Sequence, residues 1–307
     1  MTVAAPFHRP RLTGSRTLVW RSRTDLQIGL DDDAVVLAAV PRHTEDLVRL
    51  LDGHHTLGDL SRELPEAWVT WVVANLARHD RLAEGPAARV PVPLVRVLGS
   101  GALAAAVGRG LLDAGVRLRL TDTSRESALR VEHLARLLGQ GLRPTDRPIV
   151  EREFDGRGPA ADVTVVATEP TEPDRSVTDQ LAASGATHLL ARLQPGRAVV
   201  GPFVVPGRTP CVHCTDLART ALDGAWPVVA CELSRVLAPA SATGTAWAAA
   251  VVAAQVSAHA RGGRPETLAG TIELGDDGVT RFRRAARHPA CPCRGVELRS
   301  EAVRMGA

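Results

Sequence analysis

Two closely spaced cysteine pairs, Cys211-x-x-Cys214 and Cys291-Pro-Cys293, constrain the fold of this chain more than any other feature. Folding can bring their four sulfurs around one point, which is the tetrahedral ligand set that a structural zinc ion accepts. Turn-forming proline and glycine residues surround both pairs, as is typical of a zinc knuckle. We therefore predict a structural zinc ion in the C-terminal half, held by these four cysteines.

The alternatives for these cysteines are ordinary core residues or disulfide bonds, and disulfide bonds need an oxidising compartment. The first residues, Met-Thr-Val-Ala-Ala-Pro-Phe-His-Arg, carry no apolar signal core, so we expect a cytoplasmic protein with reduced thiols. A bridge within Cys291-Pro-Cys293 would also be strained. The fifth cysteine, Cys231, has no close partner, and we expect a buried free thiol there.

Composition narrows the classes of function. A length of 307 residues suggests about two domains, and a net charge of +3 gives no case for a nucleic-acid partner or an anionic membrane. The chain contains no lysine, which excludes Schiff-base chemistry, a lysine general base and a P-loop lysine on nucleotide phosphates.

The longest uncharged run covers residues 236–258 and raises the question of a membrane span. The run is mostly alanine and contains proline, glycine, serine, threonine and glutamine, so its insertion into a bilayer would be weak. We predict a buried or interface helix over residues 245–260, ended by Gly262-Gly263, and no contact with a membrane.

Residues 1–88 are predicted to form the first domain. Three extended segments are followed by three helical stretches, the second with Thr56 as its cap and the third entered through Pro65. Three strands and three helices in this size predict a winged-helix-like module. The segments cover residues 17–21, 26–30 and 34–40, and the helices cover residues 42–51, 56–63 and 66–79.

The third helix of this module has too many apolar residues for a DNA-recognition helix. Apolar residues cover more than one stripe, and only Arg78 and Arg81 near its end are basic. An apolar helix beside an open strand edge is typical of a groove in which a partner peptide adds a strand to the sheet. The alternative is that the second apolar face packs on the C-terminal domain.

Residues 89–307 are predicted to form a Rossmann-like α/β domain. A strand over residues 94–98 leads into Gly99-Ser-Gly101-Ala-Leu-Ala104, and a second strand ends near Asp122, where a ribose hydroxyl could bind. Glycines at these positions also serve simply to let a helix pack close to a strand. Later strands, at 148–152, 163–167, 188–193 and 198–204, alternate with helices and predict a mostly parallel sheet.

Taken together, these motifs resemble a known group of proteins. The Rossmann-like start, the stretch Val-Gly-Pro-Phe-Val-Val-Pro-Gly-Arg-Thr-Pro-Cys-x-x-Cys and the late Cys-Pro-Cys resemble the ThiF/MoeB superfamily, the ubiquitin-activating-enzyme-like fold. Leu26-Gln-Ile-Gly-Leu30, Leu51-Asp-Gly53 and Asp223-Gly-Ala-Trp226-Pro227 are similar to the leader-peptide-binding partner proteins of azoline-forming, YcaO-dependent cyclodehydratases.

The resemblance implies that the N-terminal module is a RiPP recognition element, which clamps the leader of a ribosomally made precursor peptide. The leader would pair with the third strand and lie against the third helix. The ThiF/MoeB-like domain would be a docking scaffold, and a separate YcaO enzyme would bind ATP and form thiazolines or oxazolines. A homodimer is compatible with the superfamily. The implied leader-binding residues are Val35, Val36, Leu37, Ala38, Trp68, Val69, Val72, Val73 and Leu76.

Active members of the superfamily place an arginine and a lysine on the ATP phosphates, and use an Asn-x-x-Arg-Gln stretch and a magnesium-binding aspartate. This chain lacks the lysine and the stretch, and Glu169 at best replaces the aspartate. We therefore expect a vestigial nucleotide site at Gly99, Gly101 and Asp122, no ATP, and a non-catalytic subunit. The alternatives are an active ATP-dependent adenylyltransferase and a Rossmann oxidoreductase or ligand-sensing regulator, against which the four cysteines argue.

Overall fold

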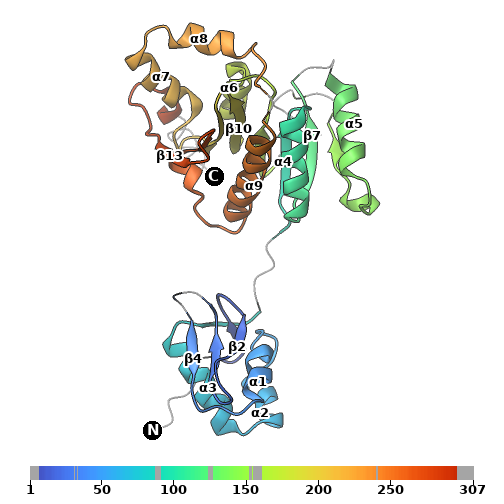
Figure 1. Ribbon diagram of the computed structural model, residues 1–307, viewed down its shortest axis with the longest axis vertical. Helices are drawn as coiled ribbons and strands as arrows, with labels where there is room; N and C mark the ends of the chain where they lie inside the picture. Colours follow the sequence, from blue (N-terminus) through green and yellow to red (C-terminus); the bar gives the residue numbers. More distant parts are fainter. Residues whose placement is uncertain are drawn as a thin grey trace, which may run out of the picture. The chain divides into compact units, whose positions relative to one another are not determined.

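The computed structural model describes residues 7–295 apart from 31, 33, 87–90, 124–126, 152–153, 155–160 and 240 (Figure 1). The chain divides into two compact units, residues 1–89 and residues 90–307. Each unit has a hydrophobic core of its own.

The N-terminal unit combines a three-stranded antiparallel sheet, in the order β2-β3-β4, with three helices and a separate β1–β5 pair. The pair joins segments some 70 residues apart and lies outside the predicted elements, because pairing between segments so distant in the sequence has no local turn signal. The elements are β1 (Pro10–Leu12), β2 (Leu18–Trp20), β3 (Leu26–Ile28), β4 (Val35–Leu37), α1 (Thr44–Leu50), α2 (Leu57–Glu63), α3 (Glu66–Arg78) and β5 (Leu82–Glu84).

Local sequence explains the start of the second and third helices. The hydroxyl of Thr56 accepts a hydrogen bond from the amide of Asp59, and the Asp59 carboxylate accepts one from the amide of Thr56, which is a capping box. Pro65 precedes α3, and one face of that helix packs on β4. The inward residues of β3 and β4 complete the core of the unit.

The C-terminal unit is built on an eight-stranded sheet in the order β13-β12-β11-β10-β9-β6-β7-β8. Its strands are β6 (Leu94–Leu98), β7 (Arg117–Thr121), β8 (Ile149–Val150), β9 (Val163–Val166), β10 (His188–Gln194), β11 (Arg197–Val204), β12 (Gly270–Gly275) and β13 (Thr280–Arg284). Its helices are α4 (Ala102–Asp113), α5 (Ala128–Leu138), η2 (Pro144–Asp146), α6 (Arg175–Ala183), α7 (Val212–Leu222), α8 (Trp226–Leu233), α9 (Ala242–Ala260), η3 (Glu266–Ala269) and η4 (Pro292–Gly295).

The sheet is mixed, and the prediction of a mostly parallel sheet is wrong for its second half. Strands β8, β7, β6, β9 and β10 pair in parallel, whereas β10 through β13 pair antiparallel. For β10 and β11 the reason is the turn at Pro195-Gly196, which joins the two strands with two residues and so allows only a hairpin. Gly196 supplies the positive φ of 76° at this turn.

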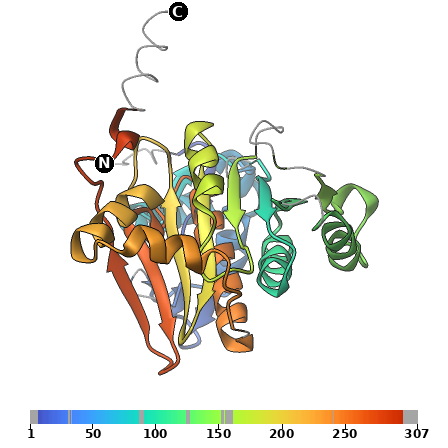
Figure 2. The ribbon, with the colours of Figure 1, turned by 90° about the horizontal axis from the view of Figure 1, so that it is seen from above.

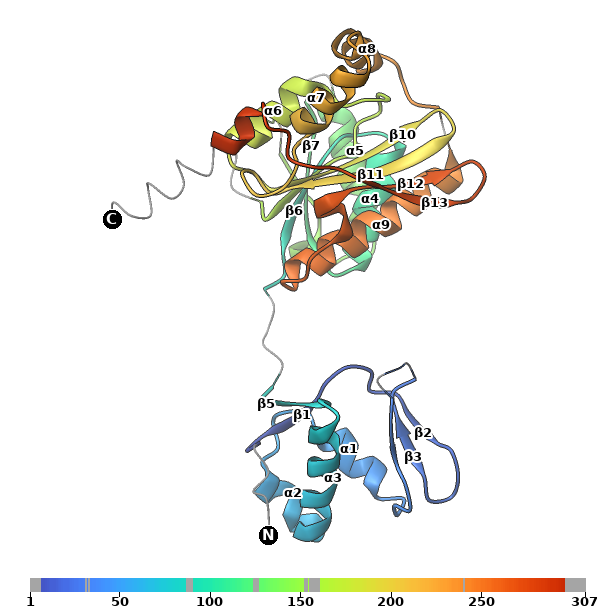
Figure 3. The ribbon, with the colours of Figure 1, turned by 90° about the vertical axis from the view of Figure 1, so that its left-hand side faces the viewer.

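Helices cover both faces of the sheet (Figures 2 and 3). Residues of α4, α5 and α9 share the larger core on one face, while α6 and the start of α7 pack on the other. Helix α9 approaches α4 closely: a Cβ added at Gly110 would lie 3.3 Å from the carbonyl oxygen of Ala249. The predicted alanine-rich helix thus begins three residues earlier than expected, with Ser241 as its cap, and is partly buried against α4. Among the described helices, none has the length and apolarity needed to cross a membrane.

The solvent exposure of Cys231 on helix α8 differs from the prediction. Cys231 is exposed, so the expectation of a buried thiol is wrong. Ala230 is the buried residue of this short helix, and Val228 and Val229 are exposed as well. The helix therefore has too small a packed face to cover the thiol.

Candidate functional site

The two cysteine pairs converge at one point of the C-terminal unit. Cys211 and Cys214 lie at the start of α7, and Cys291 and Cys293 lie at and within η4. Their Sγ atoms are 3.7 Å apart within the first pair, and 3.6 Å and 3.5 Å apart across the two pairs. Zinc–sulfur bonds of about 2.3 Å in a tetrahedron would place the sulfurs about 3.8 Å apart. The cluster therefore has the size and the donors of a four-thiolate zinc site.

The surroundings of the cluster are compatible with metal binding. All five cysteines are free thiols, and Cys211, Cys214 and Cys291 are buried. Burial raises the pKa of Cys211 well above its usual range and raises that of Cys291 to about 12. Burial works in the same direction on Cys214, but hydrogen bonds with backbone groups of His288 and Cys211 outweigh it and lower that pKa. A bound divalent cation would offset the cost of burying thiolates.

The predicted nucleotide residues meet at the carboxyl ends of the parallel strands. Gly99 follows β6 with φ of 141°, and a Cβ there would lie 2.2 Å from the carbonyl oxygen of Ala167. Gly101 caps α4, and Ser100 donates a hydrogen bond to Asp122 at 2.5 Å. Here the order of strands reverses, which is where open α/β sheets bind their ligands.

Acidic side chains dominate this nucleotide-type site. A Cβ on Gly101 would lie 2.4 Å from Cγ of Glu169, so Glu169 closes over the glycine turn. Arg130 lies 3.4 Å from the Glu169 carboxylate. A neighbouring pocket of about 480 Å³ is lined mainly by small and apolar residues of α4 and the start of α9. Asp122 and Glu169 would repel nucleotide phosphates unless a cation lay between them.

The predicted leader-binding residues divide into two groups. Val36, which is 40% exposed, Ala38 and Trp68 reach the surface or lie close to it. The other six side chains belong to the core of the N-terminal unit, so the apolar excess of the third helix is used largely for internal packing. These buried residues are Val35, Leu37, Val69, Val72, Val73 and Leu76.

The predicted leader-binding residues did not include one exposed aromatic residue of α3. Trp71, 39% exposed, stacks on Trp68 with ring centres 5.0 Å apart, and His43 meets Trp68 edge-on at 6.4 Å. Two tryptophans three residues apart lie on one face of a helix, and this spacing is the signal that could have found the pair. Strand β4, which contacts α3, has an outer edge that pairs with no strand among residues 7–86 as described.

No protein-family model matches this sequence, and no curated protein matches it either. Solved structures do match its fold. E. coli MccB gives a TM-score of 0.60 at 16% identity over 93% of this chain and 96% of MccB. The fold resembles that of MccB. The microcin C7 biosynthetic enzyme MccB in complex with N-formylated MccA gives a TM-score of 0.61 at 16% identity over 93% and 99% of the two chains.

The heterocyclase TruD is the third neighbour. It gives a TM-score of 0.59 at 17% identity over 93% of this chain, which spans 42% of TruD. At these identities the likeness establishes a mixed α/β fold of the MccB type and nothing finer. The winged-helix character of the N-terminal unit stays a prediction.

Proposed function

We propose that this protein binds the leader of a ribosomally synthesised precursor peptide and presents it to a YcaO-type cyclodehydratase for thiazoline or oxazoline formation. The observation that carries the proposal is a fold match over 93% of the chain both to MccB in complex with N-formylated MccA and to a heterocyclase. The same fold occurs in MccB, which has been solved with MccA, and in part of the heterocyclase TruD. A peptide-presenting subunit of a heterocyclase is compatible with both matches.

The share of TruD that is matched supports a role in peptide handling and not in ring formation. More than half of the heterocyclase has no counterpart in this chain. If the matched part handles the peptide, the part of TruD outside the match would be the candidate for the ring-forming chemistry.

The binding residues that we propose lie on β4 and α3. The leader would add a strand at the open edge of β4, beside Val36 and Ala38, and place apolar side chains against the Trp68–Trp71 pair. Main-chain hydrogen bonds would supply affinity and the side-chain contacts would supply selectivity. Zinc, bound by Cys211, Cys214, Cys291 and Cys293, would have a structural role.

An active adenylyltransferase is the second candidate, because Gly99, Gly101, Asp122 and Glu169 do meet at the switch point of the sheet. MccB has also been solved with ATP. Against this candidate stand the absence of lysine from the whole sequence and the two carboxylates that face the glycine turn.

The test is fluorescence polarisation of the leader half of a precursor peptide encoded near the gene, with and without ATP, together with ATP–pyrophosphate exchange. We expect micromolar or tighter binding that ATP does not change, and no exchange. Leader binding that requires ATP, or exchange above background, would replace the scaffold proposal with the adenylyltransferase. No leader binding under either condition would refute the proposal outright.

A further inference from the structure

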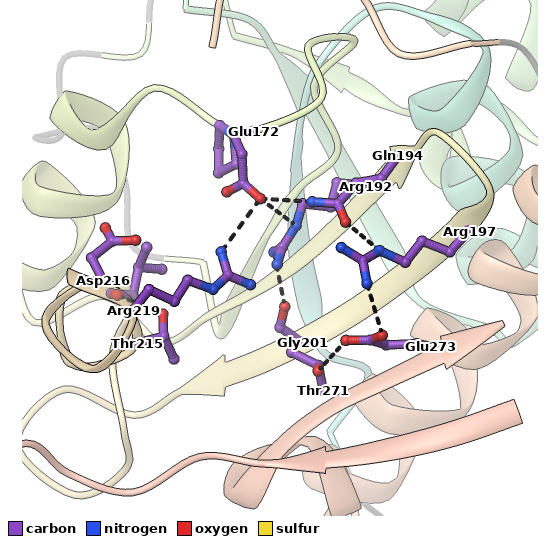
Figure 4. A network of polar contacts seen from close by, with 12 residues as sticks. Glu172, Arg192, Gln194, Arg197, Gly201, Thr215, Asp216, Arg219, Thr271 and Glu273 are labelled. Carbon is purple, nitrogen blue, oxygen red and sulfur yellow. Dashed lines mark hydrogen bonds and ion pairs between the residues drawn. The ribbon is translucent and has the colours of Figure 1, made fainter. Parts of the chain in front are cut away.

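A network of charged residues lies between α7 and strands β10 to β13 (Figure 4). At one end is Glu172, whose side chain is 2% exposed. Its carboxylate accepts hydrogen bonds from Gln194 at 2.7 Å and from Arg175 at 3.0 Å, and it lies 3.3 Å from Nε of Arg192. Glu172 follows β9, whereas Gln194 and Arg192 project from β10.

A second carboxylate anchors the other end of the network. Glu273 on β12 accepts a hydrogen bond from Arg283 at 2.8 Å and lies 3.5 Å from Arg197. Arg197 also donates to Gln194 at 2.7 Å, so the two ends are joined through β10 and β11. The charged groups therefore form one continuous row across four strands.

Helix α7 forms the facing wall. Asp216 accepts two hydrogen bonds from Arg175, at 2.7 and 3.0 Å, and one from the indole of Trp226 at 2.8 Å. Arg219 lies over the Trp226 ring, 4.4 Å from its centre, and its Nη1 is 3.8 Å from Glu172. The wall is thus fixed in place by its own ion pairs.

The space between wall and sheet is hollow. Two adjoining pockets, of about 460 and 550 Å³, share Arg219, Leu222, Glu273 and Arg283 as lining residues. We call the joined pockets the arginine trough. A single small anion would fill only part of either pocket, whereas an extended chain could occupy both.

The trough has an excess of positive charge. The ion pairs that border the trough join five guanidinium groups, from Arg175, Arg192, Arg197, Arg219 and Arg283, to three carboxylates, from Glu172, Asp216 and Glu273. Arg284, Arg287 and Asp223 also line the pockets. Three of the guanidinium groups keep a solvent-facing side, because the side chains of Arg283, Arg197 and Arg219 are 63%, 40% and 37% exposed.

Arg192 is the most buried of these five arginines. Its side chain is 7% exposed, and its buried Nε makes no hydrogen bond within the described structure, although Glu172 is near. Burial lowers the pKa of this guanidinium. A network that served only to hold the fold would not need more arginines than carboxylates. Burying the charged Arg192 side chain also costs free energy, because the guanidinium loses its hydration.

We propose that the arginine trough binds an extended, acidic peptide segment, with two or more carboxylates placed along the row of arginines. Planar guanidinium groups match carboxylates in pairs of hydrogen bonds. Apolar residues at the rim, Leu222 and Leu233, offer contacts to the intervening side chains. The inference rests on the proposed function in one respect: the segment would belong to the precursor peptide.

The test uses the full-length, zinc-loaded protein and a fluorescein-labelled octapeptide of alternating glycine and glutamate, with a glycine–glutamine octapeptide as its uncharged match. Fluorescence anisotropy should show the glutamate peptide binding about tenfold or more tightly than the glutamine peptide, since hydrogen bonds to charged groups are the stronger ones. The difference should shrink as sodium chloride is raised.

Variants locate the binding in the trough. Arg283→Ala and Arg219→Ala should each weaken the glutamate peptide by about five- to tenfold. Arg281→Ala is the matched control: Arg281 lies on the same strand as Arg283, is ion-paired with Asp277 and lines neither pocket. It should change affinity by less than about twofold. Unchanged zinc content would show that each variant is folded.

Equal binding of the two octapeptides would overturn the inference, as would an Arg281→Ala effect as large as that of Arg283→Ala. Binding of inorganic phosphate, measured by calorimetry, without any binding of the glutamate octapeptide would also overturn it and leave a site for small anions only. The proposed function fails separately: if the leader does not bind but the glutamate octapeptide does, the trough stands and the presenting role falls. If the leader binds and the octapeptide does not, the presenting role stands and the trough proposal is refuted.

Discussion

His188 is a buried histidine that the fold keeps neutral. It lies in β10 at 1% exposure, and its Nδ1–H donates a hydrogen bond to the carbonyl of Ala186 at 2.8 Å. Burial lowers its pKa from 6.5 to about 4, and the bond to Ala186 only partly opposes this. The charged imidazolium would lose its hydration on burial.

This shift predicts a loss of stability in acid. The unfolded chain takes up a proton near pH 6.5, but the folded protein does so only near pH 4. The stabilisation is complete above pH 6.5 and is lost as the pH falls toward 4, with about 2 kcal/mol gone at pH 5. His188→Asn keeps a donor for Ala186 and cannot titrate, so urea unfolding at pH 7 and pH 5 should show a smaller loss for this variant.

His133→Asn is the control for that measurement, because His133 is exposed on α5 in the same unit. It should leave the pH dependence of unfolding unchanged. If His188→Asn follows the wild-type curve, burial of His188 is not the source of the acid sensitivity.

For single residues, the sequence predicts the chemical role of a side chain more reliably than its exposure to solvent. The four cysteines could be assigned to one cluster although 80 residues separate Cys211 from Cys291, because metal ligands come in spacings set by coordination. The environment of Cys231 could not be predicted in the same way. It depends on how little of α8 is packed, and no short motif encodes that.

Among the elements, α3 shows what helical periodicity leaves open. Its apolar residues are numerous enough to suggest a groove, yet Val69, Val72, Val73 and Leu76 lie in the core. Periodicity indicates which face of a helix is apolar but not what covers that face. The spacing of Trp68 and Trp71 could have indicated the pair, but the exposure of Trp71 is evident only in the folded unit.

We expect Val36→Glu and Trp71→Ala each to weaken leader binding by about tenfold, while circular dichroism stays unchanged, because both side chains are partly exposed. Val72→Glu is a poor test of the groove, since a carboxylate at this buried position would unfold the unit. Fluorescence polarisation of the leader peptide measures the effect.

Val19→Glu is the matched control for this prediction. Val19 on β2 is 39% exposed and, through Gln27, shares a face of the sheet with Val36 at the opposite edge. Leader affinity should be unchanged in this variant. Equal losses from Val19→Glu and Val36→Glu would mean that the leader binds the face of the sheet or responds to charge alone, and not the edge of β4.

Some strands of the C-terminal unit could be predicted from the sequence, and others could not. The segments from β6 to β11 were predictable, because apolar runs alternate with helices and end in turn residues. Strands β12 and β13 were not. Every residue of β13 is exposed, and its sequence Thr-Arg-Phe-Arg-Arg has none of the continuous apolar character of a buried strand.

For the molecule as a whole, the separate cores of the two units predict separate responses to metal removal. A chelator should lower the unfolding temperature of the C-terminal unit and leave that of the N-terminal unit unchanged, because bound zinc contributes its binding free energy to the folding of its own unit. Differential scanning calorimetry would resolve the two transitions.

Cys293→Ser should reproduce the effect of the chelator and lose bound zinc, while Cys231→Ser should retain one zinc ion per chain and the wild-type transitions. The exposed position of Cys231, away from the cluster, makes it the fitting control. A chelator that moves both transitions would show that the two units are coupled in folding, and unchanged zinc in Cys293→Ser would refute the ligand set.

The exposure of Cys231 has a practical consequence. If the four clustered thiols hold a metal ion, Cys231 on α8 is the one remaining thiol for a maleimide reagent, and a chain without lysine offers amine-directed reagents no side-chain target. Lysine-directed cross-linking would therefore miss most of this protein's contacts. A photoactivatable label on Cys231 would report which molecules come close to α8, from one defined point and without any engineered cysteine.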